Sequence, residues 1–70
     1  MCPYYFTFGF AHAHAMNGVT YDKDCVVVIY ATSATVARHI MVQNFGKLWA
    51  FQYTEQPDMA LFPRGLFPVS

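Results

Sequence analysis

The chain has 70 residues, of which 56% are hydrophobic and only 11% are charged. Its four lysines and arginines balance its four aspartates and glutamates, so no excess positive charge attracts nucleic acid or anionic lipid. No apolar run reaches the roughly 18–20 residues of a membrane span, and no basic and apolar leader marks the chain for secretion. We therefore expect one small domain, residues 1–70, with more apolar surface than it can bury alone.

The first predicted strand spans residues 4–10. Phe6, Phe8 and Phe10 alternate with small or polar residues there, so one face of the strand is wholly aromatic. An aromatic residue at every second position is typical of a strand that buries one of its two faces. We expect this aromatic side to form the centre of the core.

A turn and a second strand follow. Asn17-Gly18 is a strong turn signal because both residue types tolerate positive φ, and residues 25–30 read CVVVIY, a strand. A two-residue loop at Asn17-Gly18 predicts the register of the two strands and brings apolar residues together. The predicted pairs are Phe10 with Cys25, Phe8 with Val27 and Phe6 with Ile29.

A helix and a third strand complete the predicted core. Ser33 suits the N-cap, because its hydroxyl can accept a hydrogen bond from the first turn, and Gly46 suits the left-handed position after the helix. Apolar residues recur between them at spacings of three and four. The strand at residues 48–54 reads LWAFQYT; its alternation predicts Trp49, Phe51 and Tyr53 on one face and Leu48, Ala50 and Gln52 on the other.

This order of elements predicts an α+β fold. We expect a ββαβ domain whose three-stranded mixed sheet has the order 2-1-3, with the helix packed on one face. Residues 4–55 form the predicted core. Residues 56–70 are a predicted C-terminal tail packed on the body or on a second subunit.

The titratable residues show no complete catalytic or metal-binding pattern. His12 and His14 lie two apart, so in a strand they would project to one side, but no further ligand pair stands at a fixed spacing. We expect no bound metal, no cofactor and no catalytic residue. Cys2 and Cys25 are expected to be reduced thiols, and Cys25 to pack as a small hydrophobe.

Three segments resemble a known family. FTFGFAHAH (residues 6–14), ATVARHIM (residues 34–41) and FGKLWAFQYTE (residues 45–55) look like a group of small accessory proteins of tailed bacteriophages. The last segment is the most specific of the three. The resemblance implies a phage origin, a site of action in the host bacterial cytoplasm and a role dispensable for building the virion.

Such accessory proteins commonly act on host systems by binding. We expect a homo-oligomer that counteracts a bacterial defence by sequestering a small nucleotide-derived signalling molecule; the alternatives are direct blocking of a host or defence protein and a histidine-based metal-dependent hydrolase. Aromatic rings would stack on a base, and polar or cationic groups would bind its edges and phosphate. The predicted ligand-binding residues are Tyr5, Thr7, His12, His14, Tyr30, Arg38, Gln52 and Tyr53.

Overall fold

A computed structural model describes residues 1–10, 12–16 and 18–69. It is a small α+β domain with one α-helix, a mixed four-stranded sheet and a separate two-stranded sheet. The elements are β1 (Cys2–Thr7), β2 (His14–Met16), β3 (Val19–Tyr21), β4 (Cys25–Ala31), α1 (Ala34–Phe45), β5 (Phe51–Tyr53), the 3-10 helix η1 (Met59–Leu61) and β6 (Gly65–Pro68).

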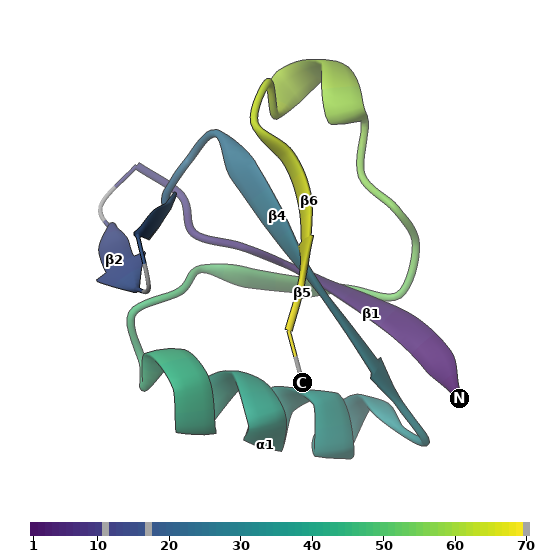
Figure 1. The fold of residues 1–70 in the computed structure, drawn as a ribbon. Helices are drawn as coiled ribbons and strands as arrows, with labels where there is room; N and C mark the ends of the chain where they lie inside the picture. Colours follow the sequence, from purple (N-terminus) through teal and green to yellow (C-terminus); the bar gives the residue numbers. More distant parts are fainter. Residues whose placement is uncertain (11, 17, 70) are drawn as a thin grey trace.

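The four-stranded sheet has the order β5-β1-β4-β6 (Figure 1). β1 pairs antiparallel with both β4 and β5, so the predicted order of these three strands is confirmed. The predicted three-stranded sheet was nevertheless incomplete, because β6 pairs parallel with β4 and forms a fourth strand at the sheet edge. Pro68 is compatible with this position, since an edge strand tolerates a residue that lacks an N–H.

The predicted register between the first two long strands was wrong by two residues. Phe6 lies opposite Val27, where Ile29 was expected, and β1 ends at Thr7. Gly9 then adopts a φ of 66°, and an added Cβ there would lie 3.2 Å from Ala50 Cβ. The chain leaves the sheet at this glycine, so Phe10 is 95% exposed and does not join the core. Because side chains alternate with a period of two residues, a register shift of two leaves each side chain on the same face of the sheet. Phe6 and Phe8 are therefore still buried.

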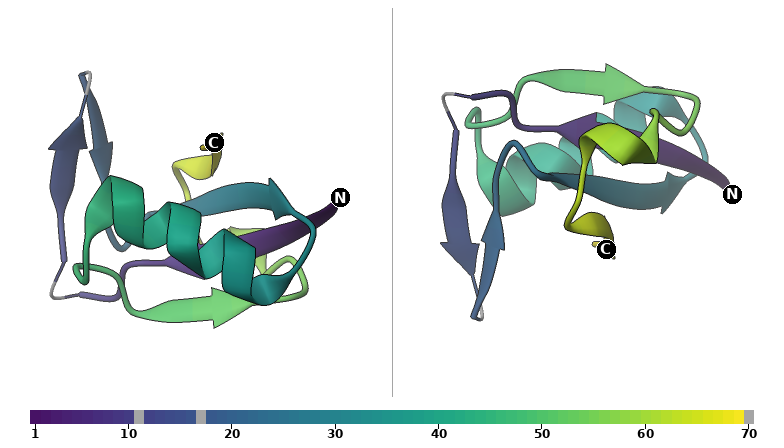
Figure 2. Two further views of the ribbon diagram at one scale, coloured as in Figure 1. Left: turned by 90° about the horizontal axis from the view of Figure 1, so that it is seen from below. Right: turned by 90° about the horizontal axis from the view of Figure 1, so that it is seen from above.

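The turn expected at residues 17 and 18 lies partly outside the described residues, because Asn17 is not among them. Met16 pairs with Val19 on either side of it, and Gly18 has a φ of 80°. β2 and β3 form their own small hairpin, which stands at one end of the main sheet beside the C-terminal end of α1 (Figure 2). The predicted register assumed that this hairpin continues the ladder between β1 and β4. In the structure the hairpin is separate from that ladder.

The helix begins and ends where its capping residues predict. Ser33 Oγ accepts a hydrogen bond from Val36 N at 3.2 Å. Gly46 has a φ of 65°, and its N–H donates to Val42 O at 2.8 Å. A residue with a Cβ disfavours this conformation, which explains why the helix stops at glycine.

The core lies between α1 and the sheet. Its fully buried large side chains include Phe6, Phe8, Ile29 and Met41, and the ring of Phe45 packs edge-on against Phe8 at 5.2 Å between centroids. Tyr21 from the hairpin contacts Phe45 at 5.1 Å, so the hairpin closes one end of this core. Phe6 and Phe8 are in the centre of the core, as the aromatic alternation predicts, whereas Phe10 is not part of it.

The predicted alternation of the third strand was wrong. Trp49 does lie on the helix side, with its ring 5.2 Å from Phe6. Gln52 lies on that side too, because it pairs with Phe6 and its side chain donates to Ala34 O at 3.0 Å. Two residues three apart share a face only where the alternation is broken, and the regular strand begins at Phe51. Phe51 and Tyr53 therefore face away from the helix.

The C-terminal segment crosses the sheet on the face opposite α1. It runs from the edge strand β5 through η1 to β6 at the other edge (Figures 1 and 2). Val26 and Val28, which face this side, are 0% and 5% exposed. The face expected to be a free contact surface is thus partly covered by the chain itself.

Candidate aromatic pocket

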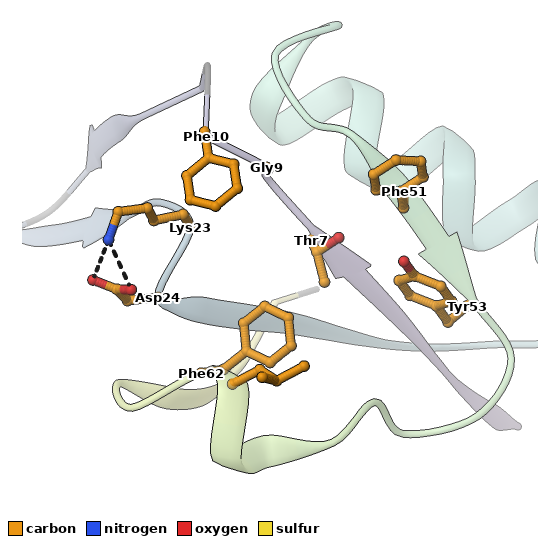
Figure 3. A pocket seen from close by; sticks show the side chains of 9 residues that line it. Thr7, Gly9, Phe10, Lys23, Asp24, Phe51, Tyr53 and Phe62 are labelled. Atoms are coloured by element: carbon orange, nitrogen blue, oxygen red, sulfur yellow. Dashed lines mark hydrogen bonds and ion pairs between the residues drawn. The ribbon is translucent and has the colours of Figure 1, made fainter.

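The sheet face opposite the helix carries a pocket of about 370 Å³. Thr7 and Gly9, at the end of β1, lie in its middle, and residues from β5, the β3–β4 turn and the end of η1 surround them (Figure 3). Such a volume falls within the range of small-molecule sites in proteins. The pocket is lined by Thr7, Gly9, Phe10, Lys23, Asp24, Phe51, Tyr53, Leu61 and Phe62.

Four aromatic rings surround this pocket (Figure 3). Phe51 and Tyr53 project from β5 with their centroids 6.2 Å apart, while Phe10 and Phe62 lie across from them. Phe10, Phe51 and Tyr53 are 95%, 59% and 41% exposed. Aromatic surface of this extent in water is a favourable place for a planar apolar group to bind.

The polar groups of the pocket lie at one end and in the floor. Lys23 Nζ contacts both carboxylate oxygens of Asp24, at 3.1 and 3.2 Å, and this pair leaves the lining without net charge. Thr7 is 5% exposed and contributes a hydroxyl to the floor. The lining can therefore exchange a few hydrogen bonds with a ring but offers no unpaired charge.

The structure does not gather the predicted ligand-binding residues into one site. Tyr5, Thr7, Tyr30 and Tyr53 lie on the sheet face opposite the helix, but of these four only Thr7 and Tyr53 line the pocket. Arg38 and Gln52 lie on the helix side, in a second groove beside β5. His12 and His14 lie at the hairpin, outside both cavities.

His14 has a structural position. Its ring packs against Phe45 at 5.3 Å and Phe8 at 6.0 Å, and its Nε2 lies 2.9 Å from Leu48 O, to which the Nε2–H tautomer donates. His12 precedes β2, so the two imidazoles do not share a strand face. Among residues 1–10, 12–16 and 18–69, no group of three or more histidine, cysteine or acidic side chains is placed to hold a metal ion.

The two cysteines are free thiols in different surroundings. Cys2 is exposed, whereas Cys25 is buried and its sulfur accepts from Asp22 N at 3.3 Å. Burial removes a thiolate from water and thereby raises the pKa of the Cys25 thiol above its ordinary value. The thiolate is the reactive form, so this cysteine is poorly suited to nucleophilic catalysis.

We expect alkylation to distinguish these two thiols. At about pH 8, close to the ordinary thiol pKa, iodoacetamide should modify Cys2 and spare Cys25 in the native protein. Because the pKa of Cys25 is raised, its modification should begin only at higher pH or after denaturation. Intact-mass spectrometry counts the adducts, with the denatured protein as the control that accepts two. Equal rates at both thiols in the native state would contradict the buried position of Cys25.

Several pocket residues were not predicted as site residues. Phe10 was assigned to the core and Phe51 to the same strand face as Trp49, while Lys23, Asp24, Leu61 and Phe62 were not assigned to any site. A signal for Phe10 was present in the sequence, because a glycine inside a strand pattern often marks the place where the chain departs from the ladder. No comparable signal existed for Phe62, whose position depends on how the C-terminal segment crosses the sheet.

Comparisons with known proteins yield no relative: no family model, no curated protein and no solved structure matches the chain. In the part of the chain that the structure describes, α1 is the longest helix, and it lacks the length and apolar character needed to cross a membrane.

Proposed function

We propose that this chain is a non-enzymatic binding protein whose aromatic pocket holds the planar ring of a small nucleotide-like molecule. The observation that supports this most is the arrangement of Phe10, Phe51, Tyr53 and Phe62 around one pocket of about 370 Å³. Base–aromatic stacking contributes roughly 1–3 kcal/mol per base and tolerates many bases, because every base has a π face.

The polar groups of the pocket suit the edge of a base. Thr7 supplies a hydroxyl in the floor, and the Lys23–Asp24 pair supplies both donors and acceptors at one end. A base carries amino, carbonyl and ring nitrogen groups that need such partners. A neutral lining of this kind favours the ring of a nucleotide over its phosphate.

The proposed biological role is sequestration, which requires tight binding of the ligand without turnover. As a homo-oligomer in the host bacterial cytoplasm, the protein would withhold a nucleotide-derived signal from a bacterial defence system. The phage resemblance of residues 6–14, 34–41 and 45–55 supports this setting. Exposed aromatic residues around the pocket support self-association, because a second copy on this face would shield both the rings and the ligand.

A protein target is the alternative function. The pocket has an exposed apolar rim formed by Phe10, Phe51, Tyr53 and Leu61. The side chain of Leu61 is 69% exposed. Aromatic residues of this type dominate the binding energy at many protein interfaces. In this alternative the rim would dock on a host or defence protein and block it, and the pocket would receive a side chain of that protein.

We expect purified protein to bind nucleosides through the pocket. Isothermal titration with the four common ribonucleosides should show saturable binding of at least one of them. Phe10→Ala should weaken that binding about tenfold, because the variant removes one stacking ring. Phe10 is almost fully exposed, so its loss should not affect folding.

Tyr30→Ala is the matched control, since Tyr30 is an exposed aromatic residue, at 57%, outside the pocket lining. It should bind as the unaltered protein does. Absence of binding by all four nucleosides, or equal affinity of Phe10→Ala and the unaltered protein, would refute the pocket as a nucleoside site and favour the protein-blocking function.

A further inference from the structure

A second cavity lies on the other side of β5. It is a groove of about 600 Å³ between α1 and the segment that leads into β5. Phe51 lines both this groove and the aromatic pocket, so the two cavities adjoin across the edge strand. The groove is lined by Arg38, Val42, Gly46, Lys47, Trp49, Ala50, Phe51 and Gln52.

The charges of the chain are divided unequally between the two cavities. Lys23 pairs with Asp24 at 3.1 Å, and Arg64 pairs with Asp22 at 3.6 Å. The two remaining cations, Arg38 and Lys47, both line the groove, and its lining includes no acidic residue. The groove therefore carries two positive charges beside a pocket whose paired lysine and aspartate leave it without net charge.

Trp49 gives the groove a fixed wall. Its Nε1–H donates to Gly46 O at 3.0 Å, and its ring packs edge-on against the buried Phe6. The guanidinium carbon of Arg38 lies 5.0 Å from the centre of the Trp49 ring. A cation–π contact of this kind restrains the guanidinium group, whose N–H groups can pair with two oxygens of a phosphate.

We infer that this groove binds the phosphates of the ligand whose ring occupies the aromatic pocket. The inference rests on the proposed function and specifies the ligand class: a nucleotide with two or more phosphate groups, whose chain passes Phe51 at the edge of β5. A pyrophosphate group carries two or three negative charges, which complement Arg38 and Lys47. The neutral pocket and the cationic groove thus select different parts of one molecule.

The single tryptophan of the chain reports on this groove directly. We expect inorganic pyrophosphate at low ionic strength to change Trp49 fluorescence in a saturable manner. Sodium chloride of equal ionic strength should not reproduce the change. The double variant Arg38→Gln, Lys47→Gln should bind pyrophosphate about tenfold more weakly by calorimetry, because it removes both cations of the groove, whose exposed positions allow water and salt to screen them.

Arg64→Gln is the matched control for charge, since it removes one cation that is already paired with Asp22 and lies outside both cavities. Its affinity for pyrophosphate should stay within about twofold of the original. A missing pyrophosphate response, or an equal affinity of the double variant, would refute the anion site.

Adenosine and ADP test whether one ligand spans both cavities. ADP should bind the unaltered protein about tenfold more tightly than adenosine, and the Arg38→Gln, Lys47→Gln variant should lose this advantage while keeping its affinity for adenosine. Adenosine binding without a gain for ADP would overturn the inference and leave the nucleoside pocket standing. Pyrophosphate binding without nucleoside binding would refute both the shared ligand and the proposed pocket function, leaving only an anion site.

Discussion

Replacing Phe8 with alanine is expected to lower the free energy of unfolding by about 3–5 kcal/mol. Phe8 is fully buried and its ring contacts Phe45, Tyr21 and His14, so its loss leaves a cavity where α1, the hairpin and the sheet meet. The total stability of a chain of this length is roughly 4–10 kcal/mol. The variant should therefore lose at least about a third of its stability and unfold at a much lower urea concentration, as measured by urea titration followed by circular dichroism.

Phe10→Ala is the matched control for Phe8→Ala, because it makes the same substitution two residues further along the chain. Phe10 is 95% exposed, so the free energy of unfolding should change by no more than about 0.5 kcal/mol. An unchanged melting midpoint for Phe8→Ala would contradict the placement of the core. A large loss for Phe10→Ala would contradict the departure of the chain at Gly9.

Replacing Val28 with aspartate is expected to cost about 3–5 kcal/mol, the penalty typical of an uncompensated buried charge. Val28 faces away from the helix but is only 5% exposed, on the side of the sheet that the C-terminal segment crosses, and its carbonyl accepts from Val69 N at 3.0 Å. The loss should appear as a lower thermal midpoint and a reduced helix signal.

Tyr30→Asp is the control for Val28, since Tyr30 lies two residues further along β4 on the same face and is 57% exposed. It should leave the thermal midpoint nearly unchanged. A Val28→Asp variant that keeps its helix signal and midpoint, and loses only its oligomeric state by light scattering, would show that Val28 lies at a subunit contact and is not buried within one chain.

Local signals were sufficient to predict the helix and the central strands. Ser33 and Gly46 define the ends of α1 through hydrogen bonding and positive φ, which act within a few residues. The alternation of Phe6 and Phe8 defines the buried side of β1, and this survives the two-residue error in register because side chains alternate with period two. The order β4-β1-β5 also follows from local elements and a short helical crossover.

The remaining parts of the fold depend on contacts between distant segments. β6 reads GLFP, in which no polar residue alternates with the apolar ones, so its pairing with β4 could not be predicted from the sequence. The broken alternation before Phe51 arises because Trp49 packs on Phe6 while Gln52 bonds to the start of the helix. The pocket combines residues from four such segments, and for this reason only Thr7 and Tyr53 of its lining were predicted.

Native mass spectrometry of the protein recovered from phage-infected, defence-carrying bacteria tests the central claim most directly. We predict an assembly of two or more copies of the chain with an additional mass in the range of a nucleotide, and Phe10→Ala should retain less of that mass while keeping the fold. A bare monomer, or a stoichiometric complex with a host or defence protein and no small molecule, would contradict sequestration of a nucleotide-like ligand.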